Sequence, residues 1–100
     1  MVTATEHLER LAVALDGAGW TVDRRYSGPP LVRVSSSKAP HIGDSIGVKD
    51  GVGGVPWFVS SCGDPLAPCH DVRRACAEVG ELLSLLAAVQ AARSSRGRVI

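Results

Sequence analysis

Apolar and polar residues near the start of the chain repeat with the period of an α-helix. Between Thr5 and Asp16 the apolar residues recur at the i, i+3, i+4 and i+7 spacing of one helical face. This face consists of Leu8, Leu11, Ala12 and Leu15. Thr3 or Thr5 can cap the first turn through its hydroxyl group. Gly17 or Gly19 can end the helix in the left-handed conformation, so the pattern predicts an amphipathic helix whose apolar face lies on a core.

The period then changes to two residues, which is typical of half-buried strands. The alternating segments cover residues 20–26, 31–35, 45–49 and 56–60. Short links rich in Gly and Pro separate most of them, so an antiparallel meander is the simplest arrangement, with the 20–26 strand at either edge. Residues 62–71 contain too much Pro and Gly for a regular element and are interpreted as a loop.

A second and longer helix is predicted after Asp71, whose carboxylate can accept hydrogen bonds from the free amides of the first turn. Apolar residues then recur at helical spacing as far as position 90. The main stripe consists of Val72, Cys76, Val79, Leu83 and Leu86. Residues 93–100 contain three arginines and no apolar period, which indicates a flexible basic tail after a single domain of residues 1–92.

Together these elements predict an α+β fold of two layers. It consists of a helix, a three- or four-stranded antiparallel meander and a long helix, with both helices packed on one face of the sheet. This order of elements is similar to the helix-sheet-helix layout of type III secretion chaperone-like folds. The similarity concerns element order without a shared motif, so it implies nothing about activity.

Composition and charge narrow the class of protein. Of the 100 residues, 45% are apolar and 21% are charged, which is the usage of a globular domain. The formal net charge of +1 provides no general attraction for nucleic acid or a membrane surface. Glu6, Glu9 and Asp16 interrupt the stretch in which a secretory signal would lie, and no apolar run approaches the roughly 20 residues of a membrane span. We therefore expect a cytoplasmic protein without a membrane partner.

Enzyme and cofactor motifs are absent from the sequence. It contains neither the H-E-x-x-H pattern of zinc proteases nor the G-x-S-x-G pattern of hydrolases. The glycines of residues 51–54 lack the Lys-Ser/Thr pair and the helix that follow in a phosphate-binding loop, so a hairpin turn explains them. We therefore expect a non-enzymatic protein without a cofactor.

The second helix carries more apolar surface than one contact with a sheet requires. The excess lies at Leu82, Leu85, Leu86 and Val89. This surface favours a small interaction or regulatory module that forms a homodimer or binds another protein through the helix. The competing interpretation is that the first helix packs across Leu85 and Val89 within one chain.

A second hypothesis is binding of single-stranded nucleic acid by the open sheet face. The alternation places Arg25, Arg33 and Lys49 on that face, and Phe58 joins them if Trp57 points inward. A lone aromatic residue and a net charge near zero argue against this partner.

A third hypothesis is a thiol or metal sensor. Cys62 and Cys69 flank the loop of residues 62–71, and Cys76 lies on the apolar stripe of the second helix. Cys69 precedes the helix start, where the helix dipole lowers the pKa of a thiol, and His70 is adjacent. The cysteines are seven residues apart, unlike the close pairs of structural zinc sites, so we predict no metal site.

Overall fold

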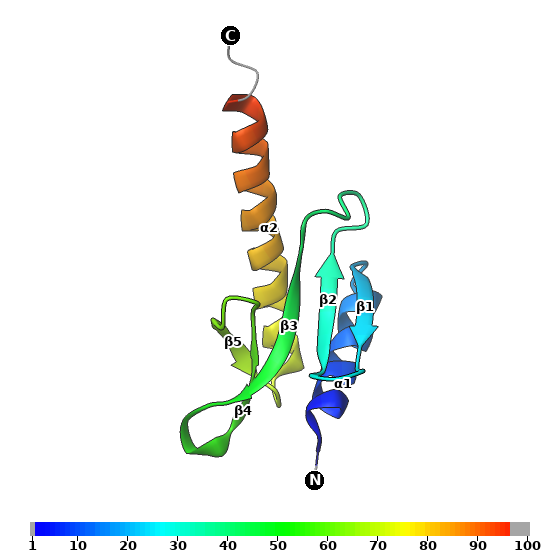
Figure 1. Ribbon diagram of the computed structural model, residues 1–100, viewed down its shortest axis with the longest axis vertical. Helices are drawn as coiled ribbons and strands as arrows, with labels where there is room; N and C mark the ends of the chain where they lie inside the picture. Colours follow the sequence, from blue (N-terminus) through cyan, green and yellow to red (C-terminus); the bar gives the residue numbers. More distant parts are fainter. Residues whose placement is uncertain (1, 97–100) are drawn as a thin grey trace.

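The computed structural model describes residues 2–96. Its elements are α1 (Ala4–Gly17), β1 (Thr21–Arg25), β2 (Leu31–Ser35), β3 (Gly43–Asp50), a short 3₁₀ turn η1 (Val52–Gly54), β4 (Pro56–Val59), β5 (Pro65–Pro68) and α2 (Val72–Arg96). The strands form one antiparallel sheet in the order β1-β2-β3-β4-β5 (Figure 1). The predicted α+β meander between two helices is confirmed, with five strands in place of three or four.

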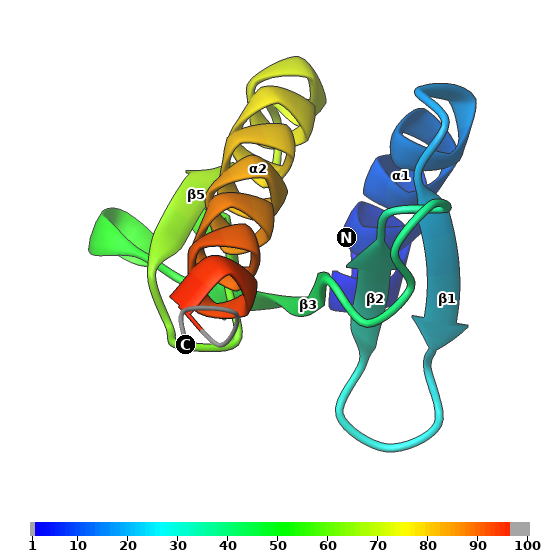
Figure 2. The ribbon, with the colours of Figure 1, turned by 90° about the horizontal axis from the view of Figure 1, so that it is seen from above.

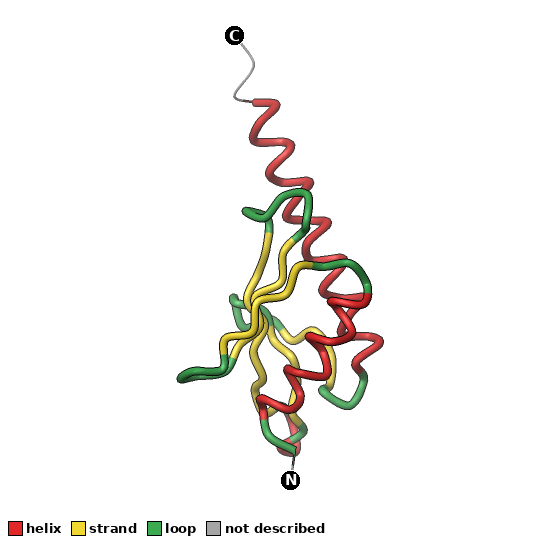
Figure 3. The backbone as a smooth tube through the Cα atoms, turned by 90° about the vertical axis from the view of Figure 1, so that its right-hand side faces the viewer, coloured by secondary structure: helices red, strands yellow, loops and turns green. Residues whose placement is uncertain are grey.

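Both helices lie on one face of the sheet, as predicted. α1 lies over β1, β2 and β3, whereas α2 packs chiefly against β5 and against α1 (Figure 2). Figure 3 shows the strands as one layer and the helices as a second layer beside it. Side chains from both layers form one core: Leu8, Leu11 and Leu15 of α1, Val32, Val34, Ile46 and Phe58 of the sheet, and Ala75, Val79 and Leu83 of α2.

Capping side chains fix where both helices begin. The Thr3 hydroxyl accepts a hydrogen bond from the Glu6 amide at 3.2 Å. The Asp71 carboxylate accepts one from the Arg74 amide at 3.1 Å. Both caps agree with the sequence, because Ser, Thr and Asp are the residues that satisfy the free amides of a first helical turn.

The β3-β4 hairpin sets which side chains of β4 face the core. Gly51 donates a backbone hydrogen bond to the Val55 carbonyl at 2.7 Å, and beyond this turn Val48 pairs with Phe58 and Lys49 with Trp57. Phe58 therefore shares the inner face with Val48 and is completely buried. The expectation that Phe58 joins the cations of the open face is wrong, and Trp57 takes that place.

β5 lies within the segment that the sequence analysis interprets as a loop. Its two prolines have no amide hydrogen, but β5 is an edge strand that pairs only with β4. The Cys69 amide continues the pairing by donating to the Pro56 carbonyl at 2.9 Å. Edge position thus permits a strand where composition predicts none, and it makes β4 an inner strand.

α2 is longer than the body on which it packs. Its 25 residues span about 37 Å, whereas β4 and β5 have only four residues each. Ala75, Val79 and Leu83 are buried, and the last turns of α2 extend beyond the sheet (Figure 1). Leu86 and Val89 lie beside His41–Gly43, at the beginning of β3. Residues 93–96 of the predicted tail belong to this helix, and the rest of that tail, 97–100, lies outside the described residues.

The phase of β4 can be tested with two truncations. Phe58→Ala removes a completely buried ring and should lower the free energy of unfolding by about 3 to 5 kcal/mol. Val52→Ala changes a side chain that is 96% exposed and should alter it by less than about 0.5 kcal/mol. Urea denaturation of both variants measures the difference, and a mild Phe58→Ala variant would contradict the inward position of the ring.

Candidate functional site

The apolar residues that the sequence singles out on α2 are exposed to different degrees. Leu85 is 65% exposed, Val89 49% and Leu86 37%, and Leu82 is half-buried. We call these four residues the leucine stripe. The interpretation in which α1 packs across Leu85 and Val89 is wrong, because both side chains stay exposed in the presence of α1.

An acidic hollow lies beside the lower end of the leucine stripe. Its volume is about 180 Å³, and its walls include Ser60, Leu66 and Leu82. The carboxylates of Asp64, Glu78 and Glu81 also line it. None of these carboxylates forms a salt bridge within the described part of the chain. Arg93 lies at the other end of the stripe, where it lines a separate hollow together with Leu86 and Val89.

By length and composition, α2 could also cross a membrane over Val72–Arg93. A segment long enough to span a membrane must include the charged residues Glu78 and Glu81. It must also include the first half of α2, where Ala75, Val79 and Leu83 belong to the core. The uncharged stretch 82–92 extends about 16 Å, whereas the hydrocarbon layer of a bilayer is about 30 Å thick. The uncharged half of α2 alone is thus too short to span a bilayer.

The open face of the sheet holds the three predicted cations. The register places Asp23, Arg33 and Ser45 in one row and Lys49 with Trp57 in another. Arg25 donates to the Asp23 carboxylate at 2.9 Å, so its charge is already paired. Arg33 and Lys49 form no salt bridge among the described residues.

Trp57 is the aromatic residue of this face, so the inward Trp57 on which the predicted place of Phe58 depended does not occur. The Arg74 guanidinium reaches its ring from the first turn of α2, with 5.7 Å between Cζ and the ring centroid. A Cβ atom at Gly51 would lie 2.8 Å from Cδ1 of the indole, so the hairpin turn passes close to the ring only because residue 51 is glycine. Trp57 is thus held between the turn and α2.

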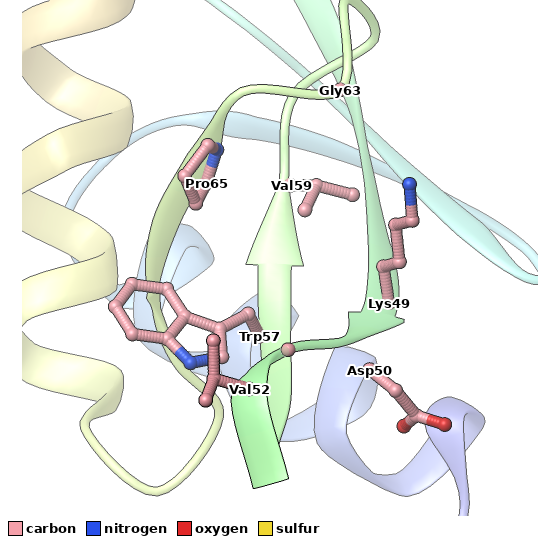
Figure 4. A pocket seen from close by; sticks show the side chains of 8 residues that line it. Lys49, Asp50, Val52, Trp57, Val59, Gly63 and Pro65 are labelled. Atoms are coloured by element: carbon pink, nitrogen blue, oxygen red, sulfur yellow. The ribbon is translucent and has the colours of Figure 1, made fainter. Parts of the chain in front are cut away.

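A hollow of about 350 Å³ opens on the same face (Figure 4). Val59 forms its floor, with Lys49 on one side and Trp57 and Pro65 on the other. Val52 and Gly63, from the two neighbouring turns, complete the rim. The alternation in β4 could have indicated this hollow only if the register had been known, because a shift by one residue exchanges Trp57 and Phe58.

The three cysteines of the sensor hypothesis differ in their exposure. All three are free: Cys62 is exposed, Cys69 is buried and Cys76 is half-buried. Burial raises the pKa of the Cys69 thiol to about 11, which is opposite to the lowering that we expect from the helix dipole. His70 is exposed, and no group of three metal-ligating side chains occurs in residues 2–96.

A polar cluster ties α1 to β1 and was not anticipated. The Glu9 carboxylate accepts hydrogen bonds from Arg24 Nε at 2.8 Å and from the Tyr26 hydroxyl at 2.9 Å. The bond from Arg24 is the main cause that lowers the pKa of Glu9. Burial, and next the bond to Glu9, raise the pKa of Tyr26 to about 12. The three side chains are hydrogen-bonded to one another, so we interpret the cluster as a structural link between α1 and β1.

Comparison with protein-family models, curated proteins and solved structures gives no match for this chain. The leucine stripe and the open sheet face are therefore the features of the molecule that point to a function.

Thiol reactivity tests the description of the cysteines. At pH 7 a thiol of pKa about 11 is ionised in roughly one molecule in ten thousand, so Cys69 should not react with Ellman's reagent in the native protein. Cys62 should react rapidly, and Cys62→Ser should remove that phase. All three thiols should react in urea, and a second rapid thiol in the native protein would contradict this assignment.

Proposed function

We propose that the protein is a non-enzymatic interaction module that forms a two-fold symmetric dimer through the free half of α2. The observation that carries this proposal is that exposed large apolar side chains gather on one stripe of α2. The others that the structure shows as exposed are valines on other segments: Val2, Val13, Val52 and Val55. Complete burial of each such side chain contributes about 1.5 to 3 kcal/mol. Leu85, at 65% exposure, has the most to gain.

The spacing along α2 suits a second copy of the same helix. Leu82, Leu85, Val89 and Ala92 follow one another at intervals of three, four and three residues, which is the seam of a helix pair. In an antiparallel pair centred at Ala87, Leu85 lies opposite Val89 of the partner subunit. Every contact then occurs twice, as two-fold symmetry requires.

Charge favours the antiparallel direction. Such a pairing brings the Arg93 end of one helix to the base of the other, where the acidic hollow lies. A parallel pair would instead place the two acidic hollows at the same level. Opposite charges at an interface select orientation and partner more than they add affinity.

The size of the surface sets the expected affinity. Residues 82–93 span about 18 Å of helix, so the contact lies at the lower end of specific interfaces. We therefore expect a reversible dimer with a dissociation constant on the order of 1 to 100 µM.

The stripe is tested by light scattering across a dilution series. The wild-type mass should rise from that of a monomer to that of a dimer with increasing concentration. Leu85→Glu should remain a monomer with an unchanged circular dichroism spectrum, because it places a charge in the centre of the seam. Val13→Glu, on an α1 side chain that is 59% exposed, is the matched control and should still dimerise. A wild-type monomer at every concentration would overturn the proposal.

The orientation is tested by reversing one charge. Arg93→Glu should weaken the dimer roughly tenfold, since it places like charges beside the partner's acidic hollow. Arg10→Glu makes the same charge change on an exposed position of α1 and should leave the mass unchanged. Equal effects of the two variants would contradict an antiparallel pair.

A further inference from the structure

The hollow on the open sheet face is separate from the leucine stripe. It lies on the side of the sheet that the helices do not cover, and none of its lining residues belongs to α2. Its volume of about 350 Å³ falls within the range of small-molecule sites. Packing of the core does not require it, because Phe58 fills the opposite face of the same strand.

Its chemistry combines a flat aromatic ring with a lysine that forms no salt bridge within residues 2–96. The Trp57 indole lines one wall, and Lys49, its neighbour across the β3-β4 pair, lines the other. Arg74 adds a second cation near the same ring. Asp50 also lines the hollow, but its carboxylate points away from the indole in Figure 4. The charged side chain nearest to Val59 is therefore that of Lys49.

We propose that this hollow binds a nucleotide, with the flat base stacked on Trp57 over Val59 and the phosphate paired with Lys49. Stacking of a base on an aromatic side chain contributes about 1 to 3 kcal/mol and tolerates any base. Ammonium groups form strong charge-assisted hydrogen bonds with phosphate oxygens. An aliphatic ligand would leave Lys49 without a partner, and a simple anion would leave Trp57 without one.

The nucleotide can be free or can be one unit of a single strand. Arg33 lies on the same face, one strand away from Lys49 and four residues along, at about 14 Å by strand geometry. In a bound single strand this arginine would meet a further phosphate. A longer ligand should then bind more tightly and with a steeper dependence on salt.

The probe is adenosine monophosphate, titrated into the ¹⁵N-labelled full chain and followed by NMR. The indole N–H signal of Trp57 and the amides of residues 49–65 should shift in a saturable manner, with a dissociation constant on the order of 0.1 to 1 mM. The indole signal of Trp20, which lies against α2 near Gly80, should not move. Adenosine, which lacks the phosphate, should bind roughly tenfold more weakly. If an oligodeoxyadenylate of eight nucleotides binds more tightly than the monophosphate, the ligand is a single strand. Equal affinity identifies the free nucleotide as the ligand.

Two lysine variants keep the test specific. Lys49→Gln should weaken binding of the monophosphate roughly tenfold. Lys38→Gln, at an exposed position in the β2-β3 loop, loses the same charge and should bind as wild type. Absence of saturable shifts at Trp57, or equal affinities of the two variants, would overturn the proposal. Because the dimer is measured by mass and the hollow by these shifts, failure of one is distinguishable from failure of the other.

Discussion

The burial of Phe58 is the contact on which the arrangement of both sheet faces depends. Its ring lies on the inner face between Val48 of β3 and Ala67 of β5, and it is completely buried. Since side chains alternate along a strand, an inward Phe58 requires an outward Trp57. The register of one hairpin therefore decides which aromatic residue stabilises the core and which lies, half-buried, on the open face of the sheet. The hollow beside Lys49 follows from that choice.

A mismatch of lengths accounts for the second surface. Strands of four to eight residues support only the first half of a 25-residue helix. The second half keeps the apolar spacing of the first, and although the segment 41–43 lies beside it, Leu85 and Val89 stay exposed. Isolated short helices are only marginally stable in water. In proteins, a helix gains most of its stability from the packing of its apolar face. A second copy of α2 would supply that packing where the sheet ends.

Sequence patterns predicted the helices, their caps and the meander well, because each depends on local spacing or on one side chain such as Thr3 or Asp71. The register of β4 was not predictable, since Trp57 and Phe58 are adjacent aromatics and either phase keeps one of them inside. β5 was not predicted because its prolines are typical of a loop. They are compatible with a strand only at the edge of a sheet, and the sequence does not show that position. The predicted lowering of the Cys69 pKa was wrong for a similar reason. The sequence shows that Cys69 lies close to a helix start, but it does not show that the side chain is buried. The excess of apolar residues on α2 was visible directly, since it needed only the helical period.

The two prolines of β5 also restrict how copies of this protein can associate. An edge strand with free amides is a template on which other strands add, and this growth leads to aggregation and fibrils. Pro65 and Pro68 remove two of those amides at one end of the sheet. At the other end, β1 presents Asp23, Arg24 and Arg25, whose charges oppose the addition of another strand. Both ends of the sheet are thus poor sites for open-ended growth, so the domain can keep an apolar helix in water without offering its strands to a fibril.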